Sequence, residues 1–429
     1  MRKRFFLLTV LMVAVFAVAV AGTRDEFKRD IRRSANNYRA YPDKDLPALT
    51  PAPAGYEPFF INHYARHGSR WLIVPTDYSY PVEELTKAEK AGKLTARGRE
   101  VLAVCRDVLE RSQGRLGELT QLGAEQHQGI ARRMGERFPG VFADGANVDA
   151  RSTVVIRCIL SMQNEINQLQ AMFPGLVIPC DAAQNDMFYL NFYPDQEVDD
   201  AREKAFALMP DFKKKHLNPQ PVLNRLFNDK HWVEQNIDGE KLVIRVFDVV
   251  SNLQSHHEWE GLDMYKGVFT VDDAYNIWLC NNARWYARSG NTPLNDYMGA
   301  WSQRNLLRDF VNRADRAISR GEHGAALRFG HEGNVLPLVS LMGLNGMDYA
   351  TADIETLADR WPSYAVFPMA CNVQMIFYRN IDRYTEGDIL VKILLNEREA
   401  TVPAVNTDCA PYYRWQDLRE HFMHRISHQ

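Results

Sequence analysis

The chain has 429 residues, with 51 Lys and Arg against 54 Asp and Glu and a formal net charge of −3. A mildly acidic protein of this kind is a poor candidate for sequence-independent nucleic-acid binding, which needs a dominant basic face. The length allows one large domain with an insertion, or two domains. The six cysteines are too widely spaced for a small disulfide scaffold, and no Cys-x-x-Cys pair suggests a zinc site.

Residues 1–21 have the layout of a secretory signal peptide. Arg2, Lys3 and Arg4 precede an apolar run that ends in the small residues Ala19-Val20-Ala21. The alternative is an N-terminal membrane anchor, for which the apolar run is borderline in length. Because the small residues favour cleavage near Ala21 or Gly22, we expect a periplasmic or secreted protein. No later segment has the pattern of a transmembrane helix, and an exported chain with six cysteines can form disulfides or keep buried thiols.

The first half of the chain alternates strand and helix patterns. "PFFINHYA" (58–65) is a short apolar run typical of a buried strand, and a charged helical pattern covers 81–111. The segment 119–140 predicts a helix with Thr120 as its N-cap. "ANVDARS" (146–152) is a second strand candidate, and the helical pattern of 154–173 follows it.

A strand pattern followed by a helix pattern also occurs near the C-terminus. A strand at 325–329, a turn at 330–333 and an apolar helix are followed by "FPMACNVQMIFYRN" and "GDILVKILLNEREA", which predict two neighbouring strands. Residues 181–320 are helical and aromatic instead. We therefore predict an α/β fold: a three-layer αβα sandwich with a mostly parallel central sheet, formed by 22–180 and 321–429, with 181–320 as an inserted α-helical cap.

Three polar clusters lie at the predicted strand ends. Arg66, His67 and Arg70 follow the first strand, Arg157 follows the second, and His331 and Glu332 follow the strand at 325–329. Active sites of open α/β sheets form at the carboxyl ends of the strands, so these three clusters are expected to converge.

Together these residue types suit phosphoryl transfer. Arg66, Arg70 and Arg157 would hold the phosphate oxygens through planar guanidinium groups. His67 would attack phosphorus as the nucleophile, and His331 would donate to the developing charge. Glu332 would protonate the leaving oxygen. The arginines would neutralise the phosphate, so no metal or other cofactor is required.

Each cluster also has a simpler interpretation. An Arg-His-Gly triplet occurs often by chance, Arg157 alone would more commonly be an ion-paired helix residue, and His331 would be a turn histidine. Lys213 to Lys215 and Arg288 could meet outer phosphates of a polyanion, but such groups are more often a solvated face. The combination and order of the three clusters favour the phosphoryl-transfer site.

The same segments carry a family resemblance. "YARHGSR" resembles the RHGxR signature of the histidine acid phosphatases, "RSTVVIRC" resembles their second motif, and "LRFGHEGNVLPLVSLMGL" is similar to their His-acid motif. "FPMACNVQMIFYR", "VKILLNERE" and "YYRWQDLRE" look like the multiple inositol polyphosphate phosphatase branch, which includes bacterial phytases. The resemblance implies a phosphoglycerate-mutase-like fold, the site residues named above and a phosphohistidine at His67.

One departure concerns the general acid. The inositol polyphosphate branch usually reads His-Ala-Glu, whereas this chain reads His331-Glu332-Gly333, with the acid one residue earlier. The wider superfamily has Asp at this earlier position.

The resemblance therefore implies an exported, metal-independent phosphomonoesterase that hydrolyses inositol polyphosphates such as phytate. Two alternatives stay open: a broad-specificity acid phosphatase for small esters, and a degenerate protein that binds phosphate without turnover. The expected partner is a small phosphate ester rather than nucleic acid or membrane, and a monomer is expected.

Overall fold

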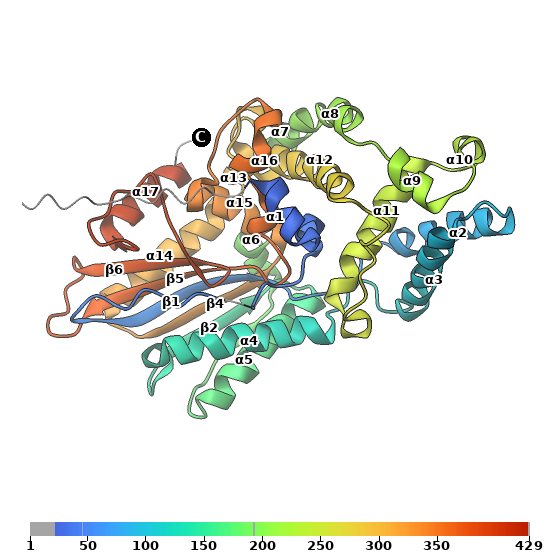
Figure 1. The fold of residues 1–429 in the computed structure, drawn as a ribbon. Coiled ribbons are helices and arrows are strands. Elements are labelled where there is room, and N and C mark those ends of the chain that lie inside the picture. The colour runs from blue at the N-terminus through green and yellow to red at the C-terminus, as the bar shows by residue number, and fades with distance from the viewer. Residues whose placement is uncertain (1–21, 45, 192–193, 428–429) are drawn as a thin grey trace, which may run out of the picture.

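A computed structural model of the protein describes residues 22–44, 46–191 and 194–427 (Figure 1). The predicted signal peptide, residues 1–21, lies outside the described residues. Among the residues that are described, no helix is both long and apolar enough to cross a membrane. All six cysteines lie in this part of the chain and none is in a disulfide.

One mixed sheet forms the centre of the molecule. Its strand order is β3-β2-β4-β1-β5-β6-β7, and β8 pairs with β6. The strands are β1 (Tyr56–Arg66), β2 (Asn147–Ser152), β3 (Cys180–Asp181), β4 (Gly324–Gly330), β5 (Asn372–Asn380), β6 (Ile389–Leu395), β7 (Arg398–Ala400) and β8 (Tyr412–Arg414).

The direction of the strands divides the sheet into two halves. Strands β3, β2, β4 and β1 are parallel, while β5 is antiparallel to β1 and the remaining pairings are antiparallel. The predicted α/β class with a helix layer on each face is confirmed, but the parallel order extends over only half of the sheet. Three long connections that contain helices join the parallel strands, whereas the short connection from β5 to β6 allows these two strands to pair antiparallel.

The alternation of side chains along β1 builds a separate core on each face of the sheet. Phe60 and Tyr64 pack with helices on one face, and Ile61 and Ala65 pack with helices on the other. This is the period of two expected for a strand covered on both sides. β1 is therefore buried between two helical layers, and its last residues are held firmly.

Each helix layer is built from a different part of the chain. Figure 1 shows α4 and α5 on one face and α14, α15 and α17 on the other. The helices of these two layers are α4 (Gln121–Arg137), α5 (Ile156–Met172), α6 (Met187–Leu190), α13 (Met298–Trp301), α14 (Arg304–Arg320), α15 (Glu332–Met342) and α17 (Trp415–Ser427). The predicted N-cap is present, because Thr120 Oγ1 accepts a hydrogen bond from Gly123 N at 3.1 Å.

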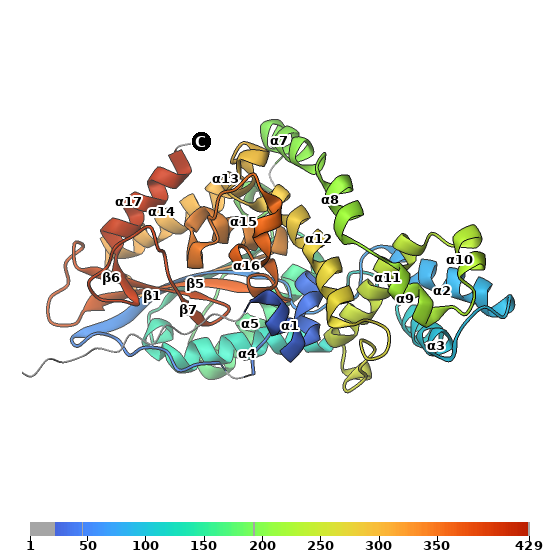
Figure 2. The same ribbon diagram turned by 45° about the horizontal axis from the view of Figure 1, so that its top comes forward.

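A helical lobe lies at the end of the sheet where β1 and β4 end (Figures 1 and 2). Its core joins side chains from 71–108 to side chains from 222–277. The lobe contains α2 (Pro75–Lys90), α3 (Ala96–Arg111), α9 (Gln220–Leu226), α10 (Lys230–Asn236) and α11 (Gly239–Asn252). The helices between the lobe and the sheet are α1 (Thr23–Arg29), α7 (Gln196–Phe206), α8 (Met209–His216), α12 (Val271–Ser289) and α16 (Leu357–Arg360). The cap boundaries at 181 and 320 stay a prediction.

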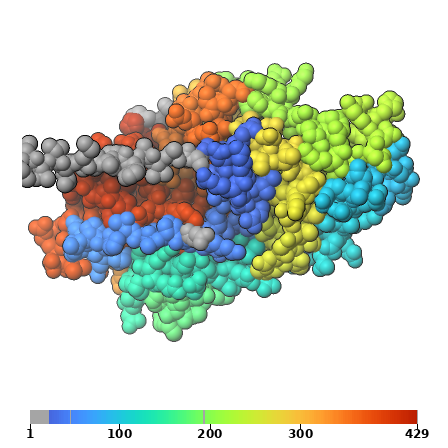
Figure 3. All heavy atoms as spheres, in the orientation of Figure 1, coloured from blue at the N-terminus to red at the C-terminus, as the bar shows by residue number. Residues whose placement is uncertain are grey.

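The N-terminal segment bridges these parts. In Figure 3 the blue surface of α1 and the following turn lies against the yellow surface of α11 and α12. Phe27 is fully buried there, with its ring against Trp278 and Tyr364. This segment therefore stabilises the position of α12 beside the sheet.

Candidate active site

The carboxyl ends of three parallel strands meet at one edge of the sheet. Arg66, the last residue of β1, lies opposite Gly330 of β4, and Ser152 of β2 lies opposite Phe329. The main chain of His67 continues this pairing, because its N–H donates to Gly330 O at 3.0 Å. The predicted convergence of the three polar clusters is therefore present in the structure.

The loop that follows β1 is packed too tightly for a side chain at Gly68. A Cβ atom at this position would lie 2.2 Å from Gly123 O of α4, and a Cβ at Gly123 would lie 2.2 Å from Ser69 O. Two glycines thus face each other where the loop crosses the first turn of α4. This contact explains why glycine follows His67, since only a glycine admits so close an approach of two main chains.

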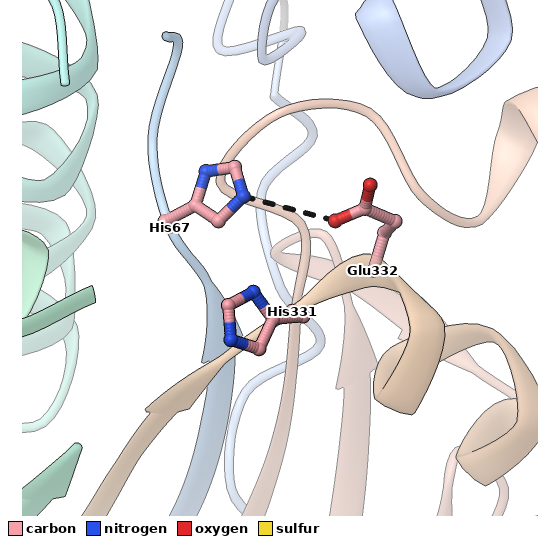
Figure 4. Close-up of side chains that lie close together, drawn as sticks. All are labelled: His67, His331 and Glu332. Atoms are coloured by element: carbon pink, nitrogen blue, oxygen red, sulfur yellow. Dashed lines mark ion pairs between the residues drawn. The ribbon is translucent and has the colours of Figure 1, made fainter. Parts of the chain in front are cut away.

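His67 is fully buried, and Nε2 faces the carboxylate of Glu332 (Figure 4). Its Nδ1 lies 2.9 Å from Gly68 O, while Nε2 lies 3.7 Å from Glu332 Oε2. Burial lowers the pKa of His67 well below its usual value, and the charges of Arg66 and Arg157 lower it further. The imidazole is therefore neutral at mildly acidic and neutral pH, which is the form that can act as a nucleophile.

Three guanidinium groups surround this imidazole. Nη1 of Arg66 donates to Asn37 O at 2.6 Å and to Phe367 O at 3.1 Å, and Nη1 of Arg70 donates to Trp71 O at 2.8 Å.

Other nitrogens of these three arginines donate no hydrogen bond within the described part of the protein. Arg66 Nη2, Arg70 Nε and Arg157 Nε are buried and have no hydrogen-bond partner among the described residues. Buried donors without partners are costly, so together they mark a place for an anion with several oxygens.

His331 and Glu332 reach the site from the start of α15 (Figure 4). The His331 ring lies 5.8 Å from the His67 ring between centroids, and its Nε2 lies 3.3 Å from Thr153 Oγ1. Burial lowers the pKa of His331 to about 4. Above that pH the ring is neutral and offers one N–H as a hydrogen-bond donor.

Glu332 is ionised in this arrangement. Burial alone would raise its pKa, but Arg66, Arg70 and His331 outweigh burial and lower the pKa to about 2. The closest of these contacts joins Arg66 Nε to Glu332 Oε2 at 3.1 Å. The carboxylate therefore neutralises part of the positive charge that surrounds His67.

The same three side chains have metal-ligand geometry. One ligand atom each from His67, His331 and Glu332 lies within 4.8 Å of the others. Arg66 and Arg70 act on the charge of all three groups, and two fixed positive charges beside the position oppose a cation there. The donor set therefore fits an anion held by arginines better than a metal ion.

Residues 65–396 match the family model of the histidine phosphatase superfamily (branch 2), which covers well over half of the chain. The chain belongs to this superfamily. This match confirms the family resemblance that the motifs predicted. The activity class of the protein is that of a phosphatase.

Solved structures with the same fold include inositol polyphosphate phosphatases and phytases. The multiple inositol polyphosphate phosphatase of Bifidobacterium longum in complex with phosphate is 17% identical, with a TM-score of 0.75 over 92% of this chain and 98% of that chain. The phytase of D. castellii is 13% identical, with a TM-score of 0.70 over 98% of this chain and 91% of that chain. Hafnia alvei phytase in complex with myo-inositol hexakis sulphate is 12% identical, with a TM-score of 0.53 over 87% and 98%. At these identities the likeness shows the fold.

The residues that were predicted as possible contacts for outer phosphates differ in their surroundings in this histidine phosphatase. Lys213 and Lys215 form ion pairs with Glu240 and Glu355, as a solvated face does. Arg288 of α12 behaves differently. It is largely buried, and Glu332 is among the charges that act on its pKa.

The structure also adds residues that the sequence analysis missed. Cys158 donates to Gly330 O at 3.2 Å and touches the His331 ring, and Tyr38 lies beneath the guanidinium of Arg70. Gln126 and Ser161 bind the main chain of the loop after β1. Of these residues only Cys158 lies in a motif, as the last residue of "RSTVVIRC". Only the helical spacing of Arg157 and Ser161, one turn apart, could have indicated that they share a face.

Proposed function

We propose that this histidine phosphatase is an exported phosphomonoesterase that hydrolyses inositol polyphosphates through a phosphohistidine at His67. The observation that supports this most strongly is the neutral, buried Nε2 of His67 among uncommitted donors of Arg66, Arg70 and Arg157. Such a cage binds a phosphoryl group and presents its phosphorus to a lone pair.

The proposed reaction has two displacements. Nε2 of His67 attacks phosphorus, the bond from phosphorus to the ester oxygen breaks, and the leaving oxygen takes a proton from Glu332. Water then attacks the phosphohistidine, gives a proton to the Glu332 carboxylate and releases inorganic phosphate. His331 donates to an equatorial oxygen during both steps.

Glu332 must be protonated for the first displacement. Its pKa of about 2 results from the same arginines that would bind the phosphate. A phosphate dianion among those arginines takes up their positive charge and repels the carboxylate, and both effects raise the pKa of Glu332. Substrate binding would therefore convert Glu332 from a counter-ion into a general acid.

A second group of arginines supports a polyphosphorylated substrate. Arg202 of α7 donates from Nε to the main-chain oxygen of Arg288 at 3.2 Å, and Arg284 lies one turn from Arg288 on α12. Burial lowers the pKa of Arg288, and the charge of Arg284 lowers it further, while the carboxylates of Asp199 and Glu332 raise it. This concentration of positive charge beside the site suits phosphates other than the one being cleaved.

The shifted position of Glu332 favours one second candidate. A broad-specificity acid phosphatase needs less exact proton delivery, because many small esters have better leaving groups than inositol. Phosphate release from phytate, a sugar phosphate and p-nitrophenyl phosphate at several acidic pH values separates the two. We expect phytate to have the highest kcat/KM, and a preference of tenfold or more for p-nitrophenyl phosphate would favour the broad enzyme.

Variants sharpen this comparison. Arg284→Ala and Arg288→Ala should raise KM for phytate and leave KM for p-nitrophenyl phosphate unchanged, with Arg316→Ala, at an exposed arginine of α14, as the control. Export is tested by locating the protein and reading its mature N-terminus by mass spectrometry, with cleavage expected near Ala21 or Gly22. Light scattering tests the expected monomer.

A further inference from the structure

One peptide unit links the proposed nucleophile to a glutamine on α4. The carbonyl oxygen of Gly68 lies 2.9 Å from Nδ1 of His67, and the N–H of Ser69, in the same peptide unit, donates to Gln126 Oε1 at 2.9 Å. In a trans peptide the C=O and the N–H point in opposite directions. Gln126 and His67 therefore bind opposite edges of one rigid plane.

This plane determines where the imidazole carries its proton. A carbonyl oxygen can only accept a hydrogen bond, so Nδ1 of His67 must be the donor to Gly68 O. In the neutral ring, Nε2 then keeps its lone pair. Because Nε2 is the atom that faces the arginines and Glu332, the orientation of the Gly68 carbonyl selects the tautomer that can attack phosphorus.

Gln126 is itself fixed in a single orientation. It is almost fully buried on α4, and its Nε2 donates to Ser69 Oγ at 3.0 Å. Since the N–H of Ser69 can only donate, the side-chain amide must present its oxygen to that group. Two hydrogen bonds to one residue hold the glutamine against the loop.

We propose that Gln126 is a positioning residue for the nucleophile, acting through the Gly68–Ser69 peptide on the tautomer and direction of His67. The proposal rests on the proposed phosphohistidine mechanism for its effect on rate. Its structural part, the control of the tautomer, does not depend on turnover.

Other hydrogen bonds hold the loop in place, so the role of Gln126 in orienting the peptide is distinct from general support of the loop. Gly68 N donates to Ser161 Oγ at 3.1 Å, and Ser69 O accepts from Thr120 N at 2.9 Å and from Thr120 Oγ1 at 3.1 Å. These bonds anchor the peptides on both sides. Loss of the Gln126 acceptor should therefore leave the loop in place. Only the Gly68–Ser69 peptide unit, which lies between these anchored peptides, should become free to rotate.

The central test compares Gln126→Met with the wild type. Methionine has a similar length and no oxygen acceptor, and Gln126→Glu keeps an oxygen in place. Gln128→Met, an exposed position of the same helix whose side chain binds Asn164, is the matched control. Rapid quench with p-nitrophenyl phosphate gives the rate of phosphoenzyme formation, and inhibition by inorganic phosphate reports the arginine cage.

We expect Gln126→Met to slow phosphoenzyme formation about 10- to 100-fold, by analogy with the loss seen when a metal-ligating histidine is deprived of its orienting hydrogen-bond partner. The inhibition constant for phosphate should change less than about threefold, because the arginines are untouched. Gln126→Glu should recover most of the rate, and Gln128→Met should match the wild type. In ¹⁵N NMR of labelled histidines, Gln126→Met should move the His67 signals from the Nδ1–H form toward a mixture of tautomers.

Two results would overturn the proposal. One is a wild-type rate together with an unchanged tautomer in Gln126→Met. The other is a parallel loss of rate, phosphate affinity and melting temperature, which would make Gln126 a structural residue only. If the wild type forms no phosphoenzyme from any ester, the proposed function fails, and the NMR comparison still decides the role of Gln126.

Discussion

Nε of Arg66 and Nε2 of His67 approach the same oxygen of Glu332, at 3.1 Å and 3.7 Å. The arginine proposed to bind phosphate and the proposed nucleophile therefore both contact one oxygen atom of the proposed general acid. An arriving phosphate would compete with Glu332 for Arg66, so the charge of the carboxyl group is coupled to occupancy of the site. This relationship makes the function of Glu332 testable through the leaving group of the substrate.

Glu332→Gln should slow hydrolysis of an inositol phosphate by about 10²-fold or more, because its leaving alkoxide needs a proton. The loss for p-nitrophenyl phosphate, whose leaving group needs little protonation, should be much smaller. Steady-state kinetics on both substrates, with melting temperatures, give the comparison. If Glu332 only anchors the start of α15, both substrates would slow by the same factor and the melting temperature would fall.

His67→Ala should abolish turnover and leave the fold intact, because His67 supplies the neutral imidazole on which the charges of Arg66, Arg157 and Arg70 act. A ³²P-labelled ester and rapid acid quench should trap an acid-labile phosphoprotein in the wild type and none in the variant. Circular dichroism confirms the fold. Near-normal turnover by folded His67→Ala would exclude the phosphohistidine mechanism.

The arginines should be sensitive to shape as well as charge. Alanine at Arg66, Arg70 or Arg157 should lower kcat/KM by about 10²-fold or more, or about 2.7 kcal/mol of transition-state stabilisation. Lysine should restore little of this, because an ammonium group cannot replace a two-pronged guanidinium. Arg132, exposed on α4 and paired with Glu136, provides a control substitution. A change of only a few-fold in Arg157→Ala would remove this residue from the site.

The acid limb of the pH profile should lie well below the usual histidine pKa. Burial and the charges of Arg66 and Arg157 lower the pKa of His67, so the neutral nucleophile persists as the pH falls. In the kcat/KM profile for p-nitrophenyl phosphate, activity should be retained below pH 6.5. Arg157→Ala removes one of these positive charges and should move the acid limb to higher pH. A wild-type limb centred at about 6.5 would contradict this account.

Much of the site could be predicted from sequence because its residues follow strands. The buried runs before His67 and His331 are recognisable by composition, and parallel strands bring their carboxyl ends together. The pairing of the two C-terminal strands was also recognisable, and β5 and β6 are neighbours in the sheet. The direction of β5 relative to β1 is not recognisable from the sequence, because a hydrophobic run carries no information on direction. The predicted mostly parallel sheet is therefore wrong for the half that contains β5 and β6.

Residues behind the site were beyond prediction for a different reason. Gln126 and Glu165 lie on helix faces that look like any buried stripe, and their partners come from other elements. The lobe core likewise joins 71–108 to 222–277, and an amphipathic helix does not specify its partner. Long-range polar contacts of this kind follow from the fold and not from local pattern.

A buried His–Glu–His group beneath the nucleophile gives a prediction for stability. Glu165 of α5 lies 2.7 Å from Nδ1 of His127 on α4 and 3.5 Å from Nε2 of His63 on β1, and all three side chains are fully buried. Burial would raise the pKa of Glu165, but the two histidines outweigh it and lower the pKa to about 2. The group therefore ties both helices of one layer to the strand that ends at His67.

The sign of the pH dependence follows from this lowered pKa. The usual glutamate value is 4.5 and the value in the fold is about 2, so the stabilisation is complete above pH 4.5 and is lost as the pH falls toward 2. Glu165→Gln should lower the free energy of unfolding by about 2 kcal/mol at pH 7, since it removes a buried carboxylate that is hydrogen-bonded to His127. The difference from the wild type, measured by urea unfolding, should shrink between pH 4.5 and 2.5. Exposed Glu136→Gln on α4, which breaks a surface pair with Arg132, should cost less than about 1 kcal/mol. A difference for Glu165→Gln that stays constant from pH 7 to pH 2.5 would mean that Glu165 is not held ionised by these histidines.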